Sequence, residues 1–213
     1  MSVFLSLYKK MPHTKSGFTI IELMVTITIV VLVTGLIMIQ YSSFNSSVLL
    51  KSQAYLTAFD IREAQTLAVG VRGQGAEFRE EYGLYFSMAA SDRNWYVLFQ
   101  DKDALGVQNP VRFQPGEEIG VPYKVDPRFS IINICATNSS SRTCYAADPH
   151  VTGEVVDTTV NSLAISFKRP DFDAMFYVPG KSNVLSVEIK FGTPNSTIVR
   201  TVTVYQTGQI SVN

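Results

Sequence analysis

A basic residue, a glycine and a carboxylate stand close together near the start of this 213-residue sequence. They occur in the stretch "KSGFTIIELMV", and Glu22 is the only charged residue between Lys15 and Lys51. Cleavage of the peptide bond between Gly17 and Phe18 would create an α-amine about one helical turn from the Glu22 carboxylate. The spacing therefore permits an ion pair between these groups, within one chain or between neighbouring copies.

The residues around Glu22 predict a helix long enough to cross a membrane. From Phe18 to Ile39 the sequence is apolar apart from Glu22, four Thr residues and one Gly. A helix of this length measures about 33 Å, against a hydrocarbon core of about 30 Å. Lys9, Lys10 and Lys15 precede the run, so the N-terminus is expected in the cytoplasm and the rest of the chain outside. A secretory signal peptide is the alternative, but its apolar core usually has only about 7–15 residues.

Glu22 has two interpretations at this position. It lies only about 6 Å into the predicted helix, so its carboxylate could reach the cytoplasmic interface of an ordinary membrane anchor. Alternatively, it is placed to receive the amine of a cleaved chain, because an unpaired charge in lipid is more costly than an ion pair. The second interpretation requires the cut after Gly17.

The run "KSG" followed by "FTIIELMV" resembles the processing site of type IV pilins and type II secretion pseudopilins. The resemblance implies that residues 1–17 are a leader, and that a prepilin peptidase cuts after Gly17 and methylates the amine of Phe18. It also implies that Glu22 helps to dock subunits and that the span over residues 18–39 is first an inner-membrane anchor, then the core of a pilus or pseudopilus. Many major pilins have a proline midway through this span, which this sequence lacks. An internal start at Met11 is an alternative.

Beyond the span, the pattern predicts a helix and then a β-rich head. Apolar residues recur at intervals of three and four over residues 40–75 and form one stripe, consisting of Leu50, Ala54, Ala58, Ile61, Ala64, Ala68 and Val71. Residues 76–213 contain period-two stretches such as "EEYGLYFS", "NWYVLFQ", "SLAISF", "SNVLSVEIKFG" and "TVTVYQTGQISV". Without further long helices, these strands should be antiparallel. The expected fold class is α+β, with a long N-terminal helix packed on an antiparallel β-sheet head.

Three further stretches are similar to a group of minor pseudopilins that includes the H-type component of type II secretion and the FimT-like pilins. They are "IREAQTLAV", "LAISFKRPDFDA" and "VYQTGQISV". This resemblance favours a minor subunit of a type II secretion system or type IV pilus. A major pilin and an uncleaved, single-pass membrane-anchored binding domain are the alternatives.

Cys135 and Cys144 are the only cysteines, and both fall in the predicted extracytoplasmic head. Disulfides persist in that environment, so this pair is the candidate intramolecular disulfide. Closing the segment "CATNSSSRTC" would stabilise the fold by about 2.5 kcal/mol through chain entropy. Two free thiols are the alternative.

Residues suited to catalysis or metal binding are sparse. One of the two histidines lies in the leader, so no catalytic triad or zinc cluster can be assembled from the sequence. Asp101 with Asp103, and Asp171 with Asp173, lack the full signature of a calcium loop and are expected to be solvated turn residues. We therefore expect no enzymatic activity, no cofactor and no metal.

The overall charge disfavours nucleic acid as a partner. The sequence has 18 Lys and Arg residues and 18 Asp and Glu residues. Loss of the leader removes three basic residues and no acidic ones, which leaves 15 against 18 and a formal charge of −3. A DNA-binding minor pilin is an alternative because the head contains Lys168, Arg169, Lys181, Lys190 and Arg200. The expected partners are a prepilin peptidase, other pilin or pseudopilin subunits and the bacterial inner membrane.

Overall fold

The computed structural model describes most of the chain, as residues 17–70, 81–89, 92–101, 112–146, 162–168, 172–193 and 198–213. The chain divides into two compact units, Met1–Asn45 and Ser46–Asn213. The described part of the first unit is mainly helical. The second unit, called the head below, contains the remainder of the same helix and all the described strands.

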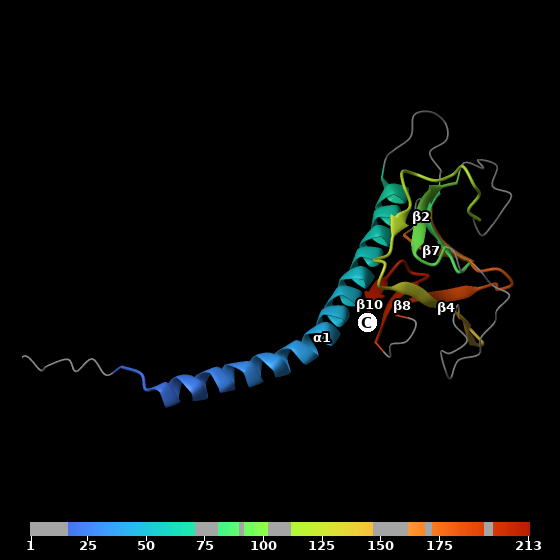
Figure 1. The fold of residues 1–213 in the computed structure, drawn as a ribbon. Coiled ribbons are helices and arrows are strands. Elements are labelled where there is room, and N and C mark those ends of the chain that lie inside the picture. Colours follow the sequence, from blue (N-terminus) through green and yellow to red (C-terminus); the bar gives the residue numbers. More distant parts are fainter. Residues whose placement is uncertain are drawn as a thin grey trace, which may run out of the picture. The chain divides into compact units, whose positions relative to one another are not determined.

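The helix α1 (Ile20–Val69) covers 50 residues (Figure 1). It ends directly before Gly70, whose backbone amide donates a hydrogen bond to the carbonyl of Thr66 at 2.8 Å. This end falls at the first glycine of "GVRGQG", and glycine is common just after the last residue of a helix. Residues 71–80 lie outside the described residues, so the proposed boundary between residues 75 and 76 stays a prediction.

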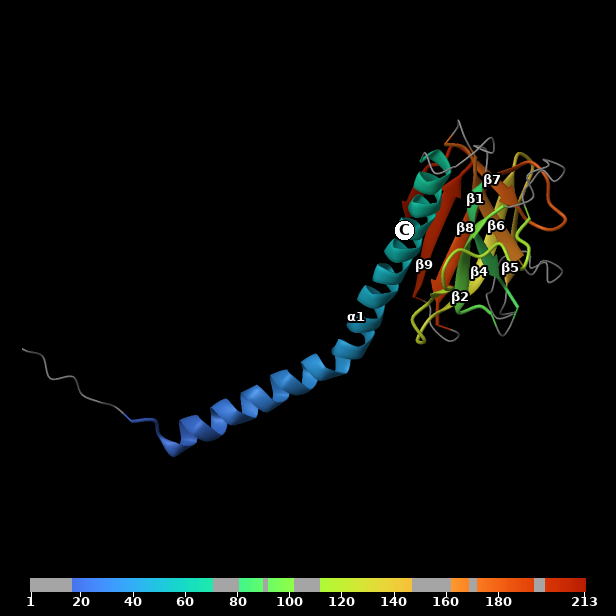
Figure 2. The ribbon, with the colours of Figure 1, turned by 90° about the horizontal axis from the view of Figure 1, so that it is seen from above.

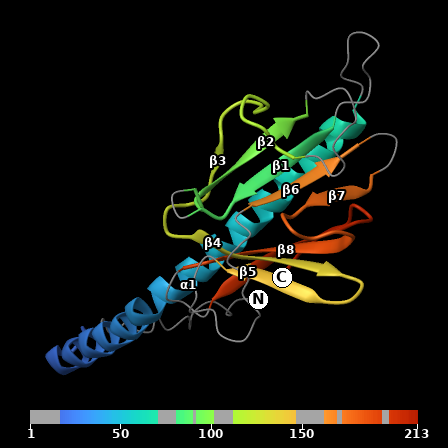
Figure 3. The ribbon, with the colours of Figure 1, turned by 90° about the vertical axis from the view of Figure 1, so that its right-hand side faces the viewer.

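The strands form two five-stranded sheets in which every pair of neighbours is antiparallel (Figure 3). The first sheet has the order β3-β2-β1-β6-β7, and the second has the order β10-β9-β8-β4-β5. The strands are β1 (Tyr82–Ser87), β2 (Trp95–Gln100), β3 (Tyr123–Lys124), β4 (Ser130–Asn138), β5 (Arg142–Ala146), β6 (Ser162–Phe167), β7 (Ala174–Tyr177), β8 (Val184–Gly192), β9 (Val199–Tyr205) and β10 (Ile210–Val212). The predicted α+β class with an antiparallel β-rich head is confirmed.

One face of α1 and alternate residues of both sheets share a single core. Six of the seven residues in the predicted apolar stripe of α1 are buried, and the seventh, Val71, lies outside the described residues. Leu84 in β1, Ile165 in β6 and Val187 in β8 are completely buried in the same core. Figure 2 shows the head part of α1 beside β9. The helix therefore holds the two sheets together by burying its apolar face.

One strand residue departs from its predicted place. The alternation in "SNVLSVEIKFG" predicts that Leu185 is buried together with Val187 and Ile189, but Leu185 is 45 % exposed. The pairing of β4 with β8 shifts register between Thr137 and Asn138, where β8 begins. Such an irregularity disturbs the regular alternation of side chains: Val184 is buried in place of Leu185, and the regular buried row of β8 begins at Val187.

Polar side chains of α1 also join the helix to β2 and β3. Tyr96 in β2 donates a hydrogen bond to the Asp60 carboxylate, and Tyr123 in β3 donates one to Glu63 at 3.2 Å. The rings of Tyr96 and Tyr123 stack with their centroids 5.4 Å apart. Burial raises the pKa of Tyr96, and it raises the pKa of Tyr123 to about 12, so both hydroxyls stay protonated. Burial also raises the pKa of Asp60, although the bond from Tyr96 opposes that shift.

Gln65 of α1 connects the helix to both sheets. Its side-chain Nε2 donates hydrogen bonds to the carbonyl of Phe172, ahead of β7, at 3.2 Å and to that of Gly208, between β9 and β10, at 3.4 Å. Gly208 has a φ of 78°, and a Cβ at this position would collide with the Phe172 carbonyl oxygen. The stretches "IREAQTLAV", "LAISFKRPDFDA" and "VYQTGQISV" thus meet at one junction. Their proximity could not be inferred from the separate patterns.

Candidate processing and assembly site

The predicted cleavage point lies in a non-helical segment directly before α1. Gly17, Phe18 and Thr19 precede the helix, which begins at Ile20. The Phe18 side chain is 83 % exposed, and nothing lies within 4 Å of the place where a Cβ of Gly17 would be. The peptide bond between Gly17 and Phe18 is therefore open to approach within the described residues. Residues 1–16 of the predicted leader lie outside them.

Glu22 and Thr19 cap the first turn of α1. The backbone amide and the hydroxyl of Thr19 each donate a hydrogen bond to Oε2 of Glu22 at 2.9 Å. The backbone amide of Glu22 donates in return to the Thr19 hydroxyl at 3.3 Å. This reciprocal pair is a capping box, in which Thr precedes the first helical residue and Glu follows three positions later. The pattern is visible in the letters "TIIE", but neither sequence-based interpretation of Glu22 included it.

The cap uses only one oxygen of the Glu22 carboxylate. Among the described residues, Oε1 of Glu22 has no hydrogen-bond partner. An ionised carboxylate offers about four lone-pair sites, so Oε1 can accept a hydrogen bond from a cation while Oε2 keeps the cap. Capping and ion pairing are therefore compatible functions of the same side chain.

The segment that follows the cap fits a membrane anchor. Ile20–Ile39 is long and apolar enough to cross a membrane, and its side chains are exposed in the isolated chain. The hydroxyls of Thr26 and Thr28 donate to the carbonyls of Leu23 and Met24 at 2.9 and 2.8 Å. These hydroxyls are satisfied within the helix and need no polar partner in lipid.

A comparison with protein families identifies the same segment. Residues 12–38 match the model described as the prokaryotic N-terminal methylation motif. No curated protein and no solved structure gave a match. The matched residues include Gly17, Phe18 and Glu22 and most of the apolar span. The chain thus carries a type IV pilin-like prepilin signal, which supports the pilin and pseudopilin superfamily and implies processing by a prepilin peptidase and assembly with other pilin subunits.

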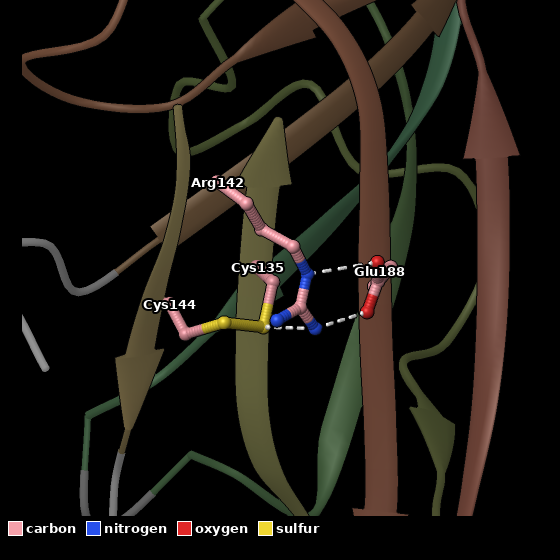
Figure 4. The surroundings of a disulfide bond; sticks show 4 residues. All are labelled: Cys135, Arg142, Cys144 and Glu188. Atoms are coloured by element: carbon pink, nitrogen blue, oxygen red, sulfur yellow. Dashed lines mark hydrogen bonds and ion pairs between the residues drawn. A yellow bond between two sulfur atoms is a disulfide. The ribbon is translucent and has the colours of Figure 1, made fainter. Parts of the chain in front are cut away.

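The candidate cysteine pair forms a disulfide between neighbouring strands of the second sheet (Figure 4). Cys135 in β4 and Cys144 in β5 are direct cross-strand partners, with a Cα–Cα distance of 3.9 Å. Arg142 in β5 donates two hydrogen bonds to the Glu188 carboxylate in β8, at 3.1 and 2.6 Å, and one to Sγ of Cys135 at 3.5 Å. Because β5 is at the edge of its sheet, the disulfide and the ion pair both secure this edge strand.

The acidic residues of the head do not form a metal site within the described segments. No group of three or more His, Cys, Asp or Glu side chains there could hold a metal ion. Asp103 and Asp171, one member of each acid pair considered from the sequence, lie outside the described residues.

Three of the five basic head residues considered from the sequence are engaged inside the head itself. Nζ of Lys181 donates a hydrogen bond to the Thr143 hydroxyl at 3.3 Å. Lys168 pairs with the buried carboxylate of Glu81, and Arg200 donates a hydrogen bond to the Ser47 hydroxyl at 3.4 Å. Burial raises the pKa of Glu81, while the hydrogen bond from Lys168 opposes this shift. Arg169 lies outside the described residues. Lys168 and Arg200 are thus partly committed to structural contacts, which reduces their value for binding phosphate groups.

Proposed function

We propose that this chain is a non-enzymatic structural subunit of a bacterial filament, cut after Gly17, methylated on Phe18 and assembled through the N-terminal part of α1. The observation that carries the proposal is the exposed bond between Gly17 and Phe18, followed by Glu22 at the start of an apolar helix, within the matched methylation motif. Before assembly, the chain crosses the inner membrane once, with the N-terminus in the cytoplasm. The lysines ahead of the span support this orientation.

In this proposal, subunits dock through an ion pair between neighbouring chains. Cleavage leaves an ammonium group on Phe18, and methylation of an amine retains its positive charge. The Glu22 carboxylate of a neighbouring subunit can accept this cation through Oε1, because Oε2 already caps the helix. In a poorly hydrated environment, the paired state is strongly favoured over two separate charges.

Within this class, we propose a minor pseudopilin or minor pilin of a type II secretion system or type IV pilus. The support is the resemblance of three stretches to the H-type and FimT-like group, together with their meeting at Gln65. A major pilin is the alternative, and the number of copies in purified filaments would separate the two. Binding of DNA by the full chain at physiological salt, measured by gel shift, would favour the DNA-binding alternative.

The first experiment tests processing. The full chain is co-expressed with a prepilin peptidase and examined by intact mass and N-terminal analysis. A mature chain that begins at methylated Phe18 is expected, and Gly17→Ala should reduce cutting. A wild-type chain that keeps Met1 or Met11 as its N-terminus would refute the proposal and favour a permanently anchored domain.

The second experiment separates the charge of Glu22 from its capping function. Glu22→Gln removes the charge but keeps an acceptor that is also found in capping boxes, whereas Thr19→Val removes the capping hydroxyl and keeps the charge. Both variants should be processed. We expect Glu22→Gln to reduce incorporation into filaments at least about tenfold, because it leaves the amine unpaired. Thr19→Val should have a much smaller effect; normal incorporation of Glu22→Gln would eliminate the docking function.

A further inference from the structure

The head part of α1 exposes a stripe of large apolar side chains. This exposed stripe consists of Val48, Tyr55, Leu56 and Phe59, which are 50 %, 53 %, 55 % and 65 % exposed. Phe59 is one helical turn from both Tyr55 and Leu56, so the three side chains are neighbours on the helix surface. They lie opposite the buried face of α1. Grouped apolar side chains on a surface mark a contact site.

Charged residues of opposite sign border the exposed stripe. At about 100° per residue, Arg62 lies on one side of Phe59 and Glu63 lies on the other. Lys51 falls within about 20° of Arg62, so both basic residues lie on the first edge. All three charged side chains are exposed. The Tyr123 hydroxyl donates to Glu63 at 3.2 Å and holds that carboxylate at the acidic edge.

The same charges argue against membrane lipid as the cover of the exposed stripe. Lys51, Arg62 and Glu63 occur within a short stretch of α1, whereas Glu22 is the only charged residue of the candidate span Ile20–Ile39. Charged side chains are costly in hydrocarbon, but an apolar centre with a charged rim is typical of a protein interface. The cover is therefore a protein surface.

We propose that the exposed stripe binds the same stripe of a second copy of this chain, with the two helices parallel. In that orientation the basic edge of each copy faces the acidic edge of the other, so Arg62 of one copy meets Glu63 of its neighbour. An antiparallel arrangement would bring like charges together. Anchoring both copies in one membrane with the same orientation favours the parallel arrangement. The apolar residues contribute affinity, and the charged edges set the orientation.

This inference rests on the proposed function and adds a partner for the head part of α1. Cross-linking of full-length chains in membranes tests it directly. Two differently tagged copies are co-expressed, one with Arg62→Cys and the other with Glu63→Cys, and the membranes are oxidised. The mixed pair should give several times more cross-linked dimer than either same-position pair. Equal yields from the mixed pair and the same-position pairs, or cross-links only to a different protein, would show that a second copy is not the partner.

Charge reversal provides an independent measurement. Arg62→Glu and Glu63→Arg should each reduce co-purification of the two tagged copies, and the double variant should restore it because the edges are exchanged. Tyr123→Phe is the matched control, since it removes the contact to Glu63 without changing the charge. If both single variants reduce co-purification and the double variant does not restore it, the proposed pairing of the edges is wrong.

Substitution within the exposed stripe distinguishes this inference from the proposed function. Phe59→Ser should reduce co-purification at least about tenfold, as expected for a central aromatic residue of an interface. Leu185→Ser, at an exposed apolar residue of β8, should have little effect. If Phe59→Ser associates normally while Glu22→Gln does not assemble, this inference is wrong and the filament function stands. If wild-type copies associate through Phe59 but remain uncut, the inference stands and the filament function is wrong.

Discussion

The hydrogen bond from Tyr96 to Asp60 allows a test of how α1 is joined to β2 within the head. Tyr96→Phe removes the donor while keeping the ring stacked on Tyr123. A hydrogen bond to a charged acceptor contributes about 1.5–3 kcal/mol, and the half-exposed position of Asp60 reduces the expected loss to about 1–2 kcal/mol. For a chain of this size, that loss corresponds to a decrease in Tm of about 2–8 °C.

The raised pKa of Asp60 also predicts the direction in which the stability of the head changes with pH. Burial raises the pKa of Asp60 above its ordinary value of 3.8, so the folded chain binds this proton more tightly than the unfolded chain. The contribution of Asp60 to the free energy of unfolding is therefore greatest below the ordinary pKa and decreases as pH rises through the raised pKa. Asp60→Asn keeps an acceptor for Tyr96 and removes the charge. At neutral pH the free energy of unfolding of this variant should equal that of wild type or exceed it by up to about 1 kcal/mol.

Urea unfolding of the full chain in detergent, followed by fluorescence of the single tryptophan Trp95, measures these changes. The advantage of Asp60→Asn over wild type should disappear when Asp60 is protonated in both states, below about pH 3.8. Tyr55→Phe, at an exposed tyrosine, is the control for loss of a hydroxyl. If Tyr96→Phe is as stable as wild type, or if Asp60→Asn loses stability mainly at neutral pH, the assigned energetics are wrong.

Three other contacts in the head have measurable consequences in the same unfolding assay. Gly83→Ala would place a Cβ against the backbone carbonyl oxygen of Ile165 and 2.8 Å from the ring of Phe99, so we expect a loss of about 1–3 kcal/mol from overpacking. An unchanged midpoint would contradict this. Replacing Cys135 and Cys144 together by Ser should cost about 2.5 kcal/mol, and reduced wild type should unfold like this variant. Gln65→Leu leaves two carbonyls without their described donor and should cost about 1–3 kcal/mol, with faster hydrogen exchange near the β9–β10 turn as the supporting observation.

The elements that could be predicted from the sequence are those that have a regular period and long runs. The stripe of α1 repeats over five turns or more, and the large side chains of β1 and β6 that face the main core occur at alternate positions, so these residues could be identified. The opposite face of both strands is also largely buried, which the alternation did not indicate. β4 could not be identified in the same way, because its pairing with β8 shifts register between Ile131 and Asn133. The division into two sheets depends on strand order, which is a property of the whole chain.

The prepilin-like motif could be recognised from the sequence because all its parts are local. Gly17, Phe18 and Glu22 lie within six positions. Their spacing and the apolar run that follows them define the motif. By contrast, Asp60 and Tyr96 are 36 positions apart, and neither residue type alone indicates a hydrogen bond. Contacts of this kind appear only when the strands are placed against α1.

The junction at Gln65 also sets an order of events during export. Gln65 and Gly208 are 143 positions apart, and all the described strands except β10 lie between them. In the proposed orientation, the chain emerges from the membrane with α1 ahead of the strands that cover it. The part of α1 around Gln65 therefore lacks this contact until the turn between β9 and β10 has been translocated, and contacts between such distant residues form slowly. A chain stalled before β9 would leave part of the apolar face of α1 exposed to whatever protein is nearby.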